Sequence, residues 1–162
     1  MGAKLPPLTP VASALLATAL AALVAGCGES PEDWDDARAD PSNAQAVDLG
    51  RKVYAAHCAV CHGANLEGQA NWRERLPNGR MPAPPHDETG HTWHHPDRVL
   101  FAITRDGLSP PYAPRGYESD MQAFRGRLSD EEIWAALAFI KSRWRPEIWT
   151  ARAERERNAS RR

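Results

Sequence analysis

The stretch Cys58-Ala59-Val60-Cys61-His62 constrains this chain more than any other part of its sequence. Two thiols and an imidazole at this spacing are typical of c-type haem attachment. Because the edge and the iron of a haem are fixed relative to each other, all three side chains must come from one short segment. We expect Cys58 and Cys61 to form thioethers to the haem and His62 to bind its iron. The pattern therefore indicates redox chemistry in which the cofactor carries out the difficult step.

The first 26 residues resemble an export signal rather than part of the fold. Lys4 is the only charged side chain there, and an apolar run leads to Ala25-Gly26-Cys27, which resembles a bacterial lipoprotein cleavage box. A weakly basic start, a short apolar run and small residues before the cut are typical of a signal peptide. We predict a signal peptide over residues 1–26 and lipidation of Cys27. The alternative is an uncleaved anchor, since the apolar run is just long enough to span a bilayer.

The three cysteines of the chain fit these assignments without remainder. One takes lipid and two take haem, so none is left for a disulfide, although an exported protein would permit one.

Composition divides the remainder into three parts. Residues 27–42 hold six acidic side chains against a single Arg38 and few apolar groups, which predicts a lipidated N-terminus followed by an acidic tether. Residues 43–145 form the folded domain. Residues 146–162 form a basic tail with five arginines and three glutamates. A short amphipathic helix is expected in this tail. A loosely packed, solvated end is the favoured interpretation, and binding of a partner or of anionic headgroups is the second.

Three helices are expected within the domain, and strand signals are weak. The first covers about residues 43–56, with apolar residues on one face. The second opens at Pro96, a residue suited to the first helical position, and ends at Gly107. The third follows Ser129, which stands at capping-box spacing from Glu132. The fold class predicted from these patterns is all-α.

At this point the chain resembles the class I c-type cytochromes, over roughly residues 43–145. Besides the haem motif, the resemblance rests on Gly50-Arg51-Lys52-Val53-Tyr54, on Asp120-Met121-Gln122-Ala123-Phe124 and on Leu137-Ala138-Phe139-Ile140-Lys141. It implies a small fold in which the N- and C-terminal helices cross and the helices wrap around one covalently bound haem. It also implies that Tyr54 meets Phe139 at the crossing, where Gly50 lets the two backbones approach closely. The stretch from Pro82 to His95 resembles a bacterial monohaem subgroup.

The resemblance implies Met121 as the second axial ligand of the iron. A thioether ligand raises the reduction potential relative to harder ligands and fills the sixth position. Members of the family usually carry Pro directly after this Met, and Gln122 stands there instead. Met81 competes, because Met81-Pro82 has the missing Pro, but it lies in the loop expected to cover the His62 side. We therefore favour Met121 and read Met81 as a haem-contacting or core side chain.

The second ring nitrogen of His62 is expected to donate to a backbone carbonyl, which fixes the tautomer. Family members use a proline carbonyl of the following loop, and the candidates stay open: Pro77, Pro82, Pro84 and Pro85.

The remaining histidines have a structural and a chemical interpretation. His57 is expected at the surface of the helix end. Four more cluster within ten residues: His86, His91, His94 and His95. Such a cluster can bind a metal or titrate near neutral pH. We favour helix capping, loop hydrogen bonds or contact with a haem propionate.

These features predict an electron-transfer protein rather than an enzyme. It would carry single electrons between redox protein partners at the membrane of a bacterial cell envelope, as a lipoprotein facing the periplasm, with no small-molecule substrate. The formal net charge of −1 argues against nucleic acid. The alternatives are a haem subunit of an oxidase or dehydrogenase complex and a gas-binding protein with an open sixth position. A zinc or thioredoxin-like site is disfavoured, since no second Cys pair is present.

Overall fold

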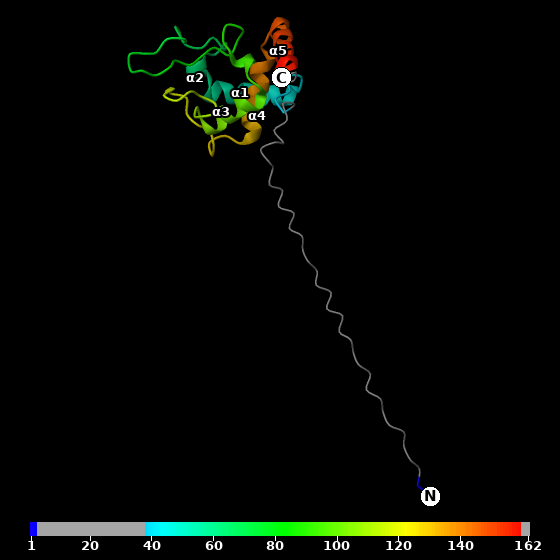
Figure 1. Ribbon diagram of the computed structural model, residues 1–162. Helices are drawn as coiled ribbons and strands as arrows, with labels where there is room; N and C mark the ends of the chain where they lie inside the picture. Colours follow the sequence, from blue (N-terminus) through cyan, green and yellow to red (C-terminus); the bar gives the residue numbers. More distant parts are fainter. Residues whose placement is uncertain (3–37, 160–162) are drawn as a thin grey trace. The chain divides into compact units, whose positions relative to one another are not determined.

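The computed structural model describes residues 1–2 and 38–159, so the predicted signal peptide, Cys27 and most of the acidic tether lie outside the described residues. The described helices are α1 (Ala44–His57), α2 (Ala59–His62), the short 3-10 helix η2 (Thr92–His94), α3 (Asp97–Asp106), α4 (Asp130–Ser142) and α5 (Pro146–Ala159) (Figure 1). In this described part of the chain there is no strand, and two isolated bridges are the only pairings of that kind. The all-α prediction is confirmed.

Helix α1 crosses α4, and a glycine allows the close approach. A Cβ atom at Gly50 would lie 1.8 Å from the backbone carbonyl oxygen of Ala135 in α4. Any other residue would therefore push the two helices apart. The rings of Tyr54 and Phe139 meet at the same crossing, with centroids 5.4 Å apart. The predicted crossing and its aromatic pair are both present.

Both crossing helices begin at a residue whose side chain caps the first turn. The side-chain oxygen of Asn43 accepts from the N–H of Ala46 at 3.1 Å, which caps α1. Ser129 and Glu132 form the predicted capping box at the start of α4, each side chain bonding the backbone N–H of the other. These caps place both crossing helices at the positions that the sequence predicts.

Helix α3 completes the apolar core. Phe101 of α3 stacks on Trp134 of α4 with ring centroids 4.3 Å apart, and Phe101 is fully buried. The cluster also includes Val53, Tyr54, Leu66, Leu100, Phe124, Leu128, Ile133, Leu137, Ile140 and Trp144. The three helices therefore share one core, on which the loops between them rest.

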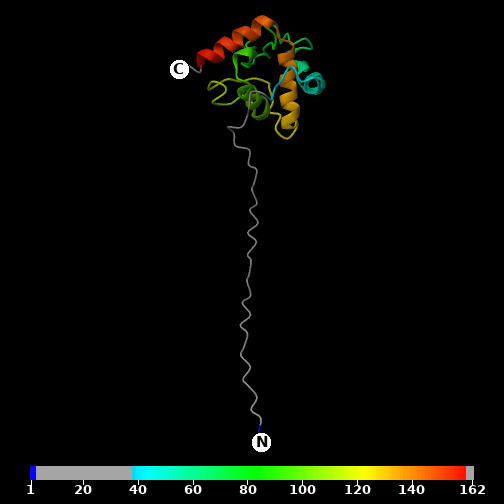
Figure 2. The ribbon, with the colours of Figure 1, turned by 90° about the vertical axis from the view of Figure 1, so that its right-hand side faces the viewer.

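Helix α5 turns away from the end of α4 instead of continuing it (Figure 2). It is fixed to α3 and α4 by a buried ion-pair group. Asp97 of α3 has no exposed surface and pairs with Lys141 of α4 and with Arg152 of α5, the latter at 2.7 Å. Arg152 also donates to the carbonyl of His95 at 2.8 Å. The loose packing predicted for residues 146–162 is therefore wrong for this helix, in which Arg152 is only 5% exposed.

The folded domain begins before the predicted boundary at residue 43. Ala39 is fully buried in the core cluster. The carbonyl of Asp40 accepts from the N–H of Asn43 at 3.2 Å, and its carboxylate accepts from Ser42. The last residues of the predicted tether thus belong to the domain. Among the residues that the structure describes, no helix is both long enough and apolar enough to cross a membrane.

Candidate functional site

A mainly apolar cavity lies beside the Cys58–His62 motif. Helices α3 and α4 line it with Leu100, Ile103, Ile133, Ala136, Leu137 and Ile140, and the loops add Gln69, Pro82, Pro84, Leu108, Tyr117 and Phe124. Cys58, Cys61, His62 and Met121 all line the same cavity. The structure therefore brings the four predicted cofactor residues together around a space with largely apolar walls, which suits a haem.

Helical backbone holds the Cys-x-x-Cys-His motif together. Cys58 directly follows α1, and the next four residues form α2, in which the N–H of His62 donates to the carbonyl of Cys58 at 2.9 Å. Cys58 is half-buried and Cys61 is exposed, and both are free thiols. Burial, with a smaller contribution from Cys61, raises the pKa of Cys58 to about 11. The Cys58 thiol is therefore protonated at neutral pH.

The ring of His62 is oriented by a single hydrogen bond. Its Nδ1 lies 2.8 Å from the carbonyl oxygen of Pro84. A carbonyl can only accept, so Nδ1 carries the proton and Nε2 presents its lone pair. Burial lowers the pKa of His62, against the opposing effect of the Pro84 bond. The neutral imidazole at pH 7 is the form that binds a metal. Of the four candidate prolines, the structure selects Pro84.

The proline loop (residues 77–86) is pinned against the segment that follows the haem motif. Gln69 and Ala83 exchange two bonds: the N–H of Gln69 donates to the Ala83 carbonyl at 2.9 Å, and its side-chain oxygen accepts from Ala83 N–H at 2.8 Å. Gly68 permits the approach, since a Cβ there would lie 2.4 Å from the backbone nitrogen of Pro85. These contacts place the Pro84 carbonyl beside His62.

The ring of His86 packs against the ring of His62, a contact that the sequence did not predict. The two rings stack with centroids 4.0 Å apart and planes at 21°. Nδ1 of His86 lies 2.7 Å from Oγ1 of Thr92, and its carbonyl accepts from Nε1 of Trp144 at 2.8 Å. Burial first, and then the charges of His62 and His91, hold the pKa of His86 well below its ordinary value. A neutral, fixed ring thus supports His62.

Met81 and Met121 both line the cavity, and their chain segments are adjacent. The N–H of Met81 donates to the carbonyl of Glu118 at 2.7 Å, and Met81 forms an isolated bridge with Ser119. The loop lies beside His62 as expected, through the Pro84 carbonyl, and Met81 near its middle also reaches the Met121 segment. The proline loop serves both sides, because it reaches the Met121 segment (residues 118–124) at Met81 and His62 at Pro84.

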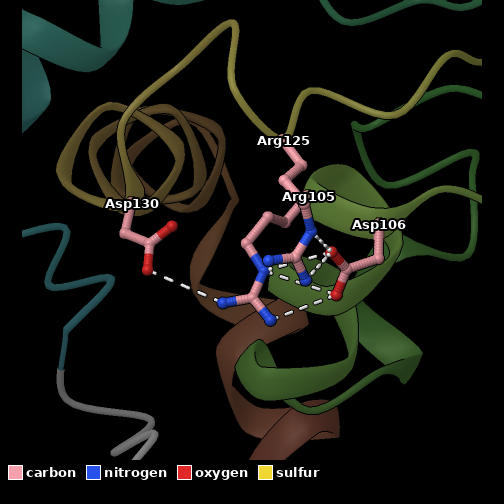
Figure 3. A network of polar contacts seen from close by, with 4 residues as sticks. All are labelled: Arg105, Asp106, Arg125 and Asp130. Atoms are coloured by element: carbon pink, nitrogen blue, oxygen red, sulfur yellow. Dashed lines mark hydrogen bonds and ion pairs between the residues drawn. The ribbon is translucent and has the colours of Figure 1, made fainter. Parts of the chain in front are cut away.

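Arg125, which directly follows the Met121 segment, is tied to α3, and α3 is tied in turn to α4 (Figure 3). Arg125 donates through its backbone N–H to the Arg105 carbonyl and through Nε to Asp106 Oδ1, both at 2.8 Å. Arg105 lies between Asp106 and Asp130 and pairs with both. Burial alone would raise the pKa of Asp106, but the hydrogen bonds and charges of Arg105 and Arg125 hold it below its ordinary value.

The other histidines divide between packing and the cavity wall. His57 ends α1, as predicted, and is half-buried there, since it lines the cavity and packs edge-on against Phe124 with centroids 6.3 Å apart. His91 and His95 also line the cavity, and His91 stacks on Trp72. No group of His, Cys, Asp or Glu able to hold a separate metal ion occurs among the described residues.

Comparison with protein families gives one finding. Residues 47–144 match the family described as Cytochrome c. The match covers more than half of the chain and includes the haem motif, the cavity and Met121. The chain therefore belongs to the cytochrome c family, whose members bind haem c covalently and transfer electrons. Comparisons with curated proteins and with solved structures gave no match.

Proposed function

We propose that this cytochrome c is a monohaem carrier that passes single electrons between membrane-associated redox partners in a bacterial cell envelope. One haem attaches at Cys58 and Cys61, since this motif occurs once in the sequence. His62 and Met121 bind its iron. The lipid on Cys27 holds the domain at the membrane, facing the periplasm. The same residues would suit a haem subunit of a larger oxidase or dehydrogenase complex, which differs in its partners rather than in its site.

The hydrogen bond between His62 and Pro84 carries this proposal. It fixes the imidazole as the tautomer whose Nε2 is able to bind iron. The bound haem supplies a one-electron couple at that position. The apolar walls contributed by α3 and α4 would exclude water from the iron and so would raise its reduction potential.

The test is the visible spectrum of the haem-loaded, dithionite-reduced protein before and after carbon monoxide. A carrier with a filled sixth position keeps sharp low-spin bands that the gas does not change. Met121→Ala should open the position, and carbon monoxide should then bind. Met81→Ala is the matched control, since it removes a second thioether from the same cavity wall.

Two results would contradict the proposal. A wild-type spectrum that shifts with carbon monoxide would mean an open iron and would favour the gas-binding alternative. Opening of the site in Met81→Ala but not in Met121→Ala would exchange the roles of the two methionines.

A further inference from the structure

The Met121 segment lacks the proline that usually stiffens it, so something else must hold it against the cavity. Gln122 stands at that position. The side-chain oxygen of Gln122 accepts from Arg127, which lies over the ring of Phe124. These contacts hold the part of the segment that follows Met121. They do not reach the residues before Met121.

The residues before Met121 are held by the proline loop. The backbone of Met81 bonds Glu118 at 2.7 Å. Arg80 adds two side-chain contacts, because Nη2 donates to the carbonyl of Ser119 and Nε lies 2.5 Å from Oδ1 of Asp120. The Arg80 side chain is 37% exposed and that of Asp120 is 68% exposed. The carbonyl contact, which is partly buried, is therefore the stronger of the two.

The other end of the segment is anchored independently of Arg80. The N–H of Phe124 donates to the Thr104 carbonyl at 3.1 Å, and Arg125 is tied to Arg105 and Asp106 of α3. Met121 thus lies between two fixed ends. The end at Phe124 is fastened to a helix, whereas the end at Asp120 is fastened to a loop by one arginine and one backbone bond.

We propose that Arg80 is a positioning residue that holds Met121 on the iron and keeps outside ligands away from it. The inference rests on the proposed ligation by Met121. When Arg80 is lost, the chain on the Asp120 side gains freedom and Met121 leaves the iron for a larger fraction of the time. An exogenous ligand binds only in that open state, so its apparent affinity rises in proportion to the open fraction.

The experiment is an imidazole titration of the oxidised, haem-loaded protein, followed by its visible spectrum. Arg80→Gln should bind imidazole roughly tenfold more tightly than wild type, the effect expected for loss of a hydrogen bond from a charged donor. Arg80→Lys retains the charge opposite Asp120 and should restore part of the wild-type behaviour. Arg51→Gln is the matched control, because Arg51 pairs with Asp48 on the exposed face of α1. It should leave the imidazole affinity unchanged.

Asp120→Asn provides a second variant, which leaves Arg80 and its bond to Ser119 in place. It removes only the exposed ion pair, so the imidazole affinity should rise less than in Arg80→Gln. Unchanged affinity in both variants, or a loss of thermal stability without a change in affinity, would overturn the role of Arg80. If wild type and Met121→Ala bind imidazole equally well, Met121 is not a ligand and the proposed function itself fails.

Discussion

The two sides of the cavity are built in different ways. On the His62 side, one backbone bond and one side-chain bond join Gln69 to Ala83, and the ring of His62 contacts the Pro84 carbonyl and the ring of His86. On the Met121 side, an irregular segment is held by arginine side chains whose partners are partly exposed. Both sides use backbone bonds, but the Met121 side adds ion pairs of arginines at the surface.

This difference predicts that the two sides respond to different perturbations. Hydrogen bonds between uncharged groups are not screened by salt. Ion pairs near the surface weaken as ionic strength rises, because the Debye length falls to about 8 Å at physiological salt. The His62 side should therefore remain fixed, while the stability of the Met121 side depends on solution conditions. Three variants test this contrast.

The largest effect is expected from Asp97→Ala, which acts on the ion pairs that join α3, α4 and α5. The change leaves Lys141 and Arg152 buried without their carboxylate. Breaking a buried pair in this way costs about 3–5 kcal/mol. Urea unfolding of the haem-loaded protein measures the loss. Asp48→Ala, on the exposed face of α1, is the control and should cost less than about 1 kcal/mol. Equal losses in the two variants would contradict the buried character of the group.

Tyr54→Phe should weaken the His62 side alone. The Tyr54 hydroxyl donates to the carbonyl of Gly63 at 2.9 Å, directly after the haem motif. Loss of this bond should cost about 1 kcal/mol in urea unfolding, since the Gly63 carbonyl then keeps only the longer bond from the N–H of Leu66 at 3.3 Å. The imidazole affinity should not change. Tyr112→Phe is the control, because Tyr112 is 40% exposed and should tolerate the change. A rise in imidazole affinity in Tyr54→Phe would show that the two sides are coupled.

The smallest effect concerns Asp106 and the pH. Its pKa in the folded protein lies below the ordinary value of 3.8, so the folded state binds its proton less readily than the unfolded state. Its contribution to stability is complete above that value and is lost as the pH falls through the folded pKa. The gap in unfolding free energy between wild type and Asp106→Asn should therefore shrink below about pH 4. A gap that stays constant from pH 6 to pH 3 would contradict this assignment.

The sequence predicted the long helices of the domain and the crossing between α1 and α4. The capping box at Ser129 depends on a few neighbouring residues and is where it was expected, and the glycine at the crossing is where the family resemblance implied it. The haem motif is likewise local, since its three side chains come from one helical turn. The cytochrome c family follows from the same features.

Contacts between distant segments were not predictable in this way. Four prolines could have supported His62, and only the fold of the loop selects Pro84. His86 was one of four clustered histidines, and nothing in the spacing placed its ring behind His62. Arg152 was one of five arginines in a basic tail, and its buried partner lies in α3. Each contact depends on where two loops or helices meet, which periodicity and capping do not encode.

The Asp97 group also joins segments that are synthesised at different times. A polypeptide leaves the ribosome N-terminus first. The thiols at Cys58 and Cys61 therefore emerge well before Lys141 and Arg152, the two cations that pair with Asp97. A chain that stops short of Arg152 would keep the haem motif and lose the α5 contact that fastens the end of the chain to α3.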